Sequence, residues 1–526
     1  MVRWLEFQGR RVLTVVASCF IVSGCWLVHR VVVEEVRRPA DSVRVATPVK
    51  AHLLGGHTVI YAAGVTLARD SLFGTGTRYD LRLQPVGPAG TLPLDSVLGM
   101  ESFRRVLDAG TTIAYSTLSV AGTIGLGVAI ACAADPKCFG SCPTFYSDSA
   151  GAEVLQAEGF SYSIAPLFEA RDVDRLRAQP DSDGVLRLEV RNEAYETHYL
   201  NQLTLLEARH AADEVVVPDG QGHLVAVRDL TRPAAARDRR HRDVRAELQV
   251  ADGRVMQTDD RTLAAARSGD LEDTVELEFP VPPGATSDSA ALLFRMRNSL
   301  LNTVLLYDVM LGDAGARSLD WQAGDLERVG PALQLGQWYA SHLGMKIAVW
   351  QHGAWMEAAH LRDTGPVAWK DIAAVVPLPP GKTLRVRLTY VVDNWRIDRV
   401  SAGFSVRRPV AQVRSVSEVL DAAGAADTAA LASLLAADQR YLQTTSGQRF
   451  SIGWRIPGAP RDSMRTFFLV SQGYYIEWIR RGWLAQPRRG TTFMPDDNAL
   501  AEAVARYREV RDTLERSFRA TRVPVR

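Results

Sequence analysis

The sequence has few cysteines, and the larger part of the chain has none. All five lie within the first 142 of 526 residues, so residues 143–526 contain none. A body of that size is therefore not held together by disulfides. The chain also lacks a charge surplus, because 61 lysines and arginines face 60 aspartates and glutamates. A dedicated nucleic-acid-binding domain is strongly basic, so we predict no nucleic-acid partner.

Signatures of catalysis are missing as well. The sequence contains no Gly-x-Ser-x-Gly elbow, no phosphate-binding loop and no His-Glu-x-x-His helix. Glu196 and His198 could share one face of a strand, but no third metal ligand stands at a suitable spacing. We therefore predict no metal site and no cofactor, and we assign no catalytic residue. A site assembled from distant residues stays open.

The N-terminus has the pattern of an export signal. Arginines precede an uncharged apolar run over residues 12–28, which is short for a membrane span and typical of a signal peptide. The run contains Val22-Ser-Gly-Cys25, which resembles the lipobox of bacterial lipoproteins. This resemblance implies that residues 1–25 are a signal peptide and that Cys25 carries the lipid. The alternative is an uncleaved membrane anchor.

A second apolar stretch affects the expected topology. Residues 111–134 carry no charge over a length that could cross a bilayer, but glycine and threonine make insertion marginal. The stretch forms either a transmembrane helix or a tightly packed buried segment. An exported lipoprotein and a protein with a single span over 111–134 both place residues 143–526 outside the cytoplasm. If both apolar segments span the membrane, residues 143–526 return to the cytoplasm. We predict the location outside, with the membrane as a partner through the N-terminal anchor.

Two cysteines flank a short loop, Cys138-Phe-Gly-Ser-Cys142. They could form a disulfide in an oxidising compartment or remain free thiols. The stretch Gly140-Ser-Cys-Pro-Thr-Phe-Tyr146 follows an apolar segment. Here the chain resembles uncharacterised bacterial envelope proteins in which a Ser-Cys-Pro-x-x-Tyr segment leads into a β-rich body. The resemblance implies no activity.

Short runs that alternate apolar and polar residues predict a mainly β fold with antiparallel sheets. The clearest are Leu186–Val190, Thr274–Phe279 and Leu384–Tyr390, and Thr58–Tyr61 is a further short β-type run. Between the N-terminal segment and the C-terminus we predict these parts: a spacer over 26–50, a small β-domain over 51–110, the apolar segment 111–134, a β-sandwich over 135–290, a second, jelly-roll-like sandwich over 291–412 and an α-rich region over 413–526 packed on the body.

The C-terminal region changes character. Residues Ser417 to Leu442 are rich in alanine and leucine and predict helix, broken near Gly424. A final helix is expected after Pro495, with Asp496 or Asp497 as its cap. Its apolar residues recur every three or four positions and should dock on the sheet: Leu500, Val504, Tyr507, Val510, Leu514 and Phe518.

Tryptophans suggest where a ligand could bind. The run Asp393-Asn-Trp-Arg-Ile-Asp-Arg-Val400 resembles an Asp-x-Trp-x-Ile-Asp-x-Val strand of jelly-roll domains in secreted proteins. Those domains often bind carbohydrate or pack beside a catalytic domain. Trp395 and Trp478 are therefore candidate ligand contacts. The alternative is that these rings fill the core.

The leading hypothesis is a membrane-anchored bacterial envelope protein that acts as a non-catalytic binding or assembly module. Its partner would be an envelope protein or a carbohydrate. Two alternatives are a secreted hydrolase with a site assembled from scattered residues and a carbohydrate-binding jelly-roll protein. Converging carboxylates in a deep cleft would favour the hydrolase, and an exposed aromatic strip on a flat sheet would favour sugar binding.

Overall fold

The computed structural model describes residues 42–54, 56–68, 70–80, 85–103, 143–149, 151–285, 287–458, 464–484, 493–518 and 522–525. The predicted lipidation site Cys25, the apolar segment 111–134 and the cysteines Cys138 and Cys142 lie outside these residues. Among the helices that the structure describes, none combines the length and the apolar character of a membrane span.

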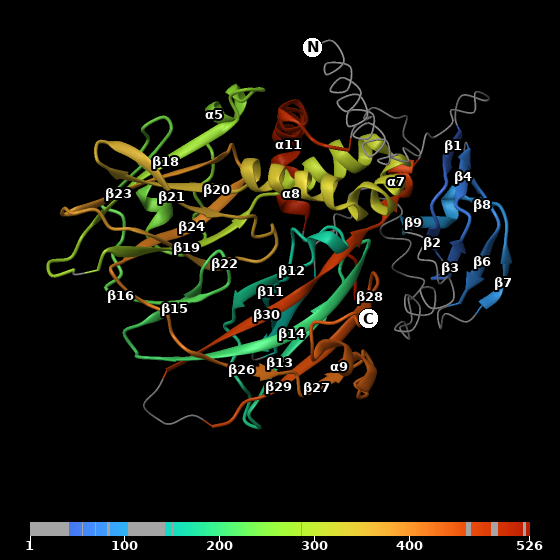
Figure 1. The fold of residues 1–526 in the computed structure, drawn as a ribbon, viewed down its shortest axis with the longest axis horizontal. Helices are drawn as coiled ribbons and strands as arrows, with labels where there is room; N and C mark the ends of the chain where they lie inside the picture. Colours follow the sequence, from blue (N-terminus) through green and yellow to red (C-terminus); the bar gives the residue numbers. More distant parts are fainter. Residues whose placement is uncertain are drawn as a thin grey trace, which may run out of the picture.

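The fold is mainly β, with several antiparallel sheets and helices toward the C-terminus, as the sequence predicted. Figure 1 shows a small β-domain at one end, two larger β-rich parts, and a group of helices beside them. One apolar cluster runs without a break from the small domain through these helices. The small domain and the helices therefore share one core, whereas each sandwich has a core of its own.

The small domain packs a four-stranded sheet (β1-β4-β5-β8) on a six-stranded sheet (β31-β9-β2-β3-β6-β7). Its last strand comes from the far end of the chain, where Ile479 pairs with Met100. The strands begin at Ser42, inside the predicted spacer. Their bounds are β1 (Ser42–Val45), β2 (Val49–Leu53), β3 (Thr58–Tyr61), β4 (Val65–Ala68), β5 (Ser71–Phe73), β6 (Gly76–Tyr79), β7 (Pro85–Ala89), β8 (Leu92–Pro93), β9 (Val97–Ser102) and β31 (Ile479–Arg480).

The first sandwich combines two segments that are far apart in sequence. Its sheets run β11-β10-β13-β29-β27 and β12-β30-β14-β26, and β28 pairs with β14. The bounds are β10 (Thr144–Ser149), β11 (Ala152–Glu158), β12 (Ala170–Arg175), β13 (Val185–Arg191), β14 (Glu196–His210), β26 (Ala411–Ser415), β27 (Glu418–Leu420), β28 (Leu442–Thr444), β29 (Arg449–Arg455) and β30 (Met464–Glu477). Because β14 pairs with β30 along its whole length, the strands do not follow the predicted boundaries at 290 and 412.

A three-stranded sheet lies between the two sandwiches. It contains β15 (Val215–Pro218), β16 (Leu224–Arg228) and β25 (Ser405–Arg407). Because successive side chains of a strand point to opposite faces, this sheet packs on the first sandwich with one face and on the second sandwich with the other. Val216 and Ala226 pack with strands β12, β14 and β30 of the first sandwich. Val217 and Val225 pack with two strands of the second, β19 (Ser289–Asn298) and β22 (Lys370–Pro377).

The second sandwich lies between β14 and β26 in the chain. Its sheets run β17-β18-β23-β20-β21 and β22-β19-β24. The bounds are β17 (Ala235–Asp238), β18 (Glu272–Pro280), β19 (Ser289–Asn298), β20 (Met345–Gln351), β21 (Ala354–Leu361), β22 (Lys370–Pro377), β23 (Thr383–Val391) and β24 (Trp395–Gly403). The predicted strands over 274–279 and 384–390 are therefore confirmed as parts of β18 and β23.

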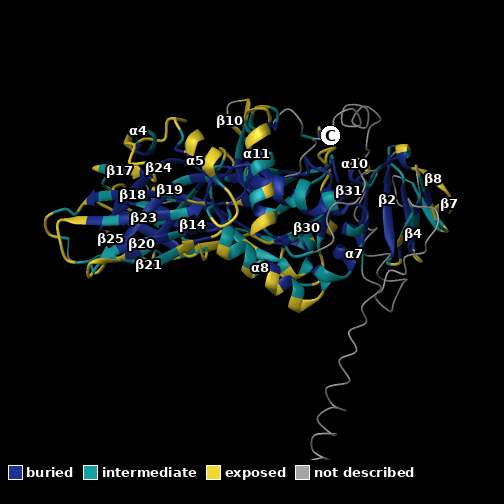
Figure 2. Cartoon of the chain, turned by 90° about the horizontal axis from the view of Figure 1, so that it is seen from above, coloured by how far each residue is buried: buried dark blue, intermediate teal, exposed yellow. Residues whose placement is uncertain are grey.

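A helical insert interrupts the second sandwich between β19 and β20. The sequence prediction of a sandwich over 291–412 did not include it. It consists of α6 (Leu301–Thr303), the π-helical segment η3 (Val304–Gly312), α7 (Arg317–Ala323), the short 3-10 turn η4 (Asp325–Glu327) and α8 (Val329–Leu343). Figure 2 shows exposed and intermediate residues over most of α8, with buried residues such as Ala332 and Leu335 between them.

The C-terminal helix α11 (Asp497–Ser517) is confirmed, with the side chain of Asp496 as its cap. Its apolar face packs mainly on η3, α6 and α5 (Asp260–Ala265), not on a sheet as predicted. The helix predicted over 417–442 is reduced to α9 (Thr428–Leu434), because β27 and β28 take up the ends of that stretch. Two further short helices are α4 (Arg245–Leu248) and α10 (Arg481–Leu484).

Candidate functional site

Both tryptophans predicted as ligand contacts are buried. Trp395 is 0% exposed, in the core of the second sandwich. Trp478 is 1% exposed, donates from Nε1 to Thr197 Oγ1 (2.9 Å) and stacks on His52 with the ring centroids 3.7 Å apart. Both rings therefore fill the interior, which was the alternative interpretation of the sequence.

Another tryptophan pair lies on the outer hairpin of the second sandwich. Trp350 on β20 faces Trp355 on β21, with the ring centroids 5.3 Å apart. Guanidinium groups lie over both rings, with Arg385 4.9 Å from the ring centroid of Trp350 and Arg387 4.3 Å from that of Trp355. This pair is therefore not an open aromatic platform of the kind that stacks on sugars.

Glu196 and His198, which stand two residues apart on β14, lie in a buried polar seam beside the small domain. Glu196 Oε1 lies 2.6 Å from His198 Nε2, and both side chains are 0% exposed. Burial raises the pKa of Glu196 to about 8 and lowers that of His198 to about 3. At neutral pH the contact is thus a hydrogen bond between uncharged groups. Among the described residues, no three His, Cys, Asp or Glu side chains are arranged to hold a metal ion.

The same seam contains a charged group on the small domain. Lys50 Nζ lies 2.8 Å and His52 Nε2 3.1 Å from Glu101 Oε1. Burial opposes ionisation of Glu101, but Lys50 and His52 outweigh it and lower the pKa to about 2. Lys50 and His52 hold one oxygen of Glu101, and the seam fixes the small domain on the body. Glu101 Oε2, Glu196 Oε2 and His198 Nδ1 are buried in it without a hydrogen-bond partner.

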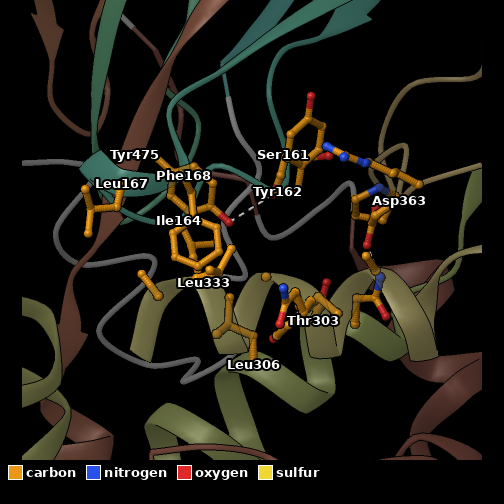
Figure 3. A pocket seen from close by; sticks show the side chains of 18 of the residues that line it. Ser161, Tyr162, Ile164, Leu167, Phe168, Thr303, Leu306, Leu333, Asp363 and Tyr475 are labelled. Carbon is orange, nitrogen blue, oxygen red and sulfur yellow. Dashed lines mark hydrogen bonds between the residues drawn. The ribbon is translucent and has the colours of Figure 1, made fainter. Parts of the chain in front are cut away.

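The best candidate for a ligand site is a cavity of about 460 Å³ between the first sandwich and the helical insert. That volume is typical of small-molecule sites. Figure 3 shows apolar side chains gathered at one end and Asp363 at the other. Most of the lining is aliphatic or aromatic: Tyr162, Ile164, Leu167, Phe168, Leu306, Tyr307, Val329, Ala332, Leu333, Tyr339, Ala340, Pro366 and Tyr475.

Three elements supply this apolar lining. The loop after β11 contains the short turn η2 (Pro166–Phe168), and it is held in place by Tyr475 on β30, which donates to Ser161 O (3.2 Å). Leu306 comes from the π-helical segment and Leu333 from α8. Leu333 remains 58% exposed at the mouth of the cavity. π-Helical turns often mark functional sites, because they reposition a side chain within a helix.

Glu158 at the end of β11 is the most unusual group in the lining. Its Oε2 accepts hydrogen bonds from the backbone N–H groups of Val367 (2.7 Å) and Ala368 (3.0 Å). Its Oε1 is buried and has no hydrogen-bond partner. Burial raises the pKa of Glu158 to about 7, although both N–H groups favour the ionised form. A buried carboxyl with one unpaired oxygen is available to a bound molecule.

Asp363 lies at the same end of the cavity, on the loop between β21 and β22. It accepts hydrogen bonds from Asn302 Nδ2 and from Gly365 N (2.8 Å), and burial raises its pKa. Gly365 has φ +85°, and a Cβ there would lie 2.6 Å from the carboxyl group of Glu158. Only glycine therefore allows the loop to close over Glu158.

No sequence pattern pointed to Glu158 or Asp363. They stand about two hundred residues apart and meet only because the first sandwich packs against the loop before β22. The one local signal is the Gly365-Pro366 pair, which marks a turn but not a site.

Comparisons with known proteins do not assign this site. No protein-family model and no curated protein matches the chain. Among solved structures, it is similar to the glycoside hydrolase family 31 α-xylosidase from Xanthomonas citri, with 11% identity and a TM-score of 0.16. The match covers 83% of this chain and 38% of the enzyme, so the chain spans well under half of that protein. A similarity of this size does not indicate a shared activity.

Proposed function

We propose that this chain is a membrane-anchored binding module of the bacterial cell envelope. Its ligand would be a small molecule with an apolar body and one hydrogen-bonding group. The observation that carries the proposal is the cavity beside the helical insert, which combines an apolar lining with the unpaired Oε1 of Glu158. Pockets of this kind bind through the apolar surface and use a few polar groups to orient the ligand.

The cavity favours one orientation of the ligand. The apolar body would lie against Leu306, Leu333 and Phe168, and the polar group would point toward Glu158. Near neutral pH the Glu158 carboxyl is present in both protonation states, because its pKa is about 7. A ligand N–H or O–H would donate to the ionised carboxylate and so repay part of the cost of its burial.

Binding can be tested with N-phenyl-1-naphthylamine, an apolar dye with a single N–H donor. Tryptophan-sensitised emission of the dye would be titrated against the full-length protein in detergent, with the detergent background subtracted. Leu333→Asp places a charge at the exposed mouth of the cavity and should weaken saturable binding at least tenfold. Leu435→Asp, at an exposed leucine (45%) after α9, is the matched control and should bind like the native protein. Equal affinities of all three proteins would refute binding in the cavity.

Anchoring is tested separately. If Cys25 is the lipidated residue, Cys25→Ala should abolish metabolic lipid labelling, and a reporter active only in the periplasm should function when fused after Arg526. Persistent labelling of Cys25→Ala, or a silent periplasmic reporter with an active cytoplasmic one, would contradict this part of the proposal. Neither result would affect the dye titration.

A second candidate function is hydrolysis, with Glu158 as the general acid. A buried carboxyl with a pKa of about 7 is suited to donating a proton near neutral pH. Chromogenic esters and glycosides are suitable probes. Hydrolysis that is lost in Glu158→Gln but retained in Leu435→Asp would support an enzyme, whereas activity unchanged in Glu158→Gln would exclude Glu158 as the acid.

A further inference from the structure

A row of charged side chains crosses one sheet of the second sandwich. Arg295 on β19 stands directly opposite Asp371 on β22 and, on its other side, opposite Arg399 on β24. These residues share the sheet face of Ala291 and Leu293, which the three-stranded sheet covers farther along. Like charges directly opposite each other destabilise a sheet unless something neutralises them.

The first sandwich adds two more arginines to this row. Arg175 ends β12, and Arg177 follows it. Asp371 receives three guanidinium groups at long range: Arg295 Nη1 at 3.4 Å, Arg399 Nη2 at 3.5 Å and Arg175 Nη1 at 3.6 Å. Tight arginine–carboxylate pairs are 2.7–2.9 Å apart, so no arginine is bonded fully to this carboxylate.

The acidic groups nearby do not balance these charges. Asp398 lies 3.5 Å from Arg295, which gives two carboxylates for four guanidinium groups. Glu214 is close, but it is already held by Arg407 and Arg228. On the other face of β22, Lys370 is paired with Asp172 and Asp174 and adds nothing to the surplus.

The arginines also have unused donors. The Nε atoms of Arg175 and Arg399 are buried without a hydrogen-bond partner. Burial, and after it the like charges of the neighbouring guanidinium groups, lowers the pKa of Arg177. Arg175 and Arg177 line a pocket of about 330 Å³ together with His210, Arg465 and the carboxylates of Asp371 and Glu214, whereas Arg295 and Arg399 lie outside its lining. Three guanidinium groups therefore face a space that is large enough for a small anion.

We propose that this arginine row is a binding site for a phosphate group, either free inorganic phosphate or a phosphate monoester. A doubly charged tetrahedral oxyanion would neutralise the surplus charge and accept from several guanidinium groups at once. The site goes beyond the proposed function and shares no lining residue with the cavity beside the helical insert.

Calorimetry on the full-length protein tests the site, with inorganic phosphate and glycerol 3-phosphate as probes and chloride at matched ionic strength as the blank. Arg175→Gln and Arg177→Gln, both at lining residues of the pocket, should each weaken binding at least tenfold. The matched control is Arg440→Gln, an exposed arginine paired with Asp438 far from the row. If glycerol 3-phosphate binds more tightly than inorganic phosphate, the ligand is a larger molecule that carries a phosphate group. Equal binding of the two probes would indicate that the ligand is free phosphate.

A second measurement separates a binding site from a structural ion-pair cluster. Without phosphate at low ionic strength, Arg177→Gln removes repulsion and should leave the melting temperature unchanged or higher. Addition of phosphate should raise the melting temperature of the native protein and of Arg440→Gln but not of Arg177→Gln. Failure of both probes to bind, native affinity in Arg177→Gln, or a lower melting temperature of that ligand-free variant would overturn the proposal.

Discussion

The most direct test of the cavity is the response of protein stability to pH when Glu158 is replaced by glutamine. Folding raises the pKa of this carboxyl from an ordinary 4.5 to about 7, mainly because it is buried. Each pKa unit corresponds to about 1.4 kcal/mol, so the ionised carboxylate costs the folded state about 3 kcal/mol. Glutamine keeps an oxygen for the N–H groups of Val367 and Ala368 but cannot ionise.

The direction of the effect follows from proton binding in the two states. Below pH 4.5 Glu158 is protonated in both the folded and the unfolded chain, so its contribution to stability is fully present. Above pH 4.5 the unfolded chain loses the proton first, and stability falls as the pH rises through about 7. Glu158→Gln should therefore be within about 1 kcal/mol of the native protein at pH 4.5 and about 2–3 kcal/mol more stable at pH 8.5.

Urea unfolding followed by tryptophan fluorescence would measure this difference. Comparing the variant with the native protein at each pH cancels the contributions of other buried carboxyls, such as Glu196. Glu357→Gln, at an exposed position on β21, controls for the removal of a carboxylate in general. If the difference between Glu158→Gln and the native protein is the same at pH 4.5 and 8.5, the account of Glu158 as a buried acid is refuted.

Three further changes test the parts that surround the cavity. In urea unfolding, Gly365→Ala should destabilise the protein by more than Gly353→Ala. Both glycines have positive φ, and an alanine in that conformation costs about 1–2 kcal/mol at either position. Only at Gly365 would the new Cβ also clash with Glu158. Tyr507→Phe should cost about 1.5–3 kcal/mol, because the buried hydroxyl accepts from Arg396 at 2.8 Å; an unchanged urea midpoint would contradict this. Deletion of α11 exposes an apolar face and should cause aggregation or rapid proteolysis, whereas a soluble truncation that unfolds cooperatively would show that the helix is dispensable.

Strand identity could be predicted from the sequence, but strand pairing could not. The runs over 186–190, 274–279 and 384–390 alternate because one face of each sheet is more deeply buried than the other, and these three runs and the run over 58–61 are all strands. Which strands pair depends on how the whole chain folds back. The pairing of β14 with β30 joins segments about 270 residues apart, and nothing in either segment specifies the other.

The helices show where local patterns fail. The stretch from Ser417 to Leu442 is rich in good helix formers, but most of it is strand or loop, because β27 and β28 complete the edges of the first sandwich. The helical insert is the reverse case, because it is helical but part of it lacks the sequence pattern of a helix. In Val304–Gly312 apolar residues are spread around the helix, so the segment has no single apolar face to reveal it.

The two proposed sites are joined by one short stretch of chain, residues 363–371. Asp363 and Pro366 line the cavity, Val367 and Ala368 hold Glu158, and Asp371 lies in the arginine row. Both sites exist because this stretch is where the second sandwich meets the first. A substitution within it would disturb both sites together, so its effect could not be assigned to either ligand. Leu333 and Arg177 lie outside the stretch, each in the lining of one site, and are therefore the positions at which the two binding functions can be separated.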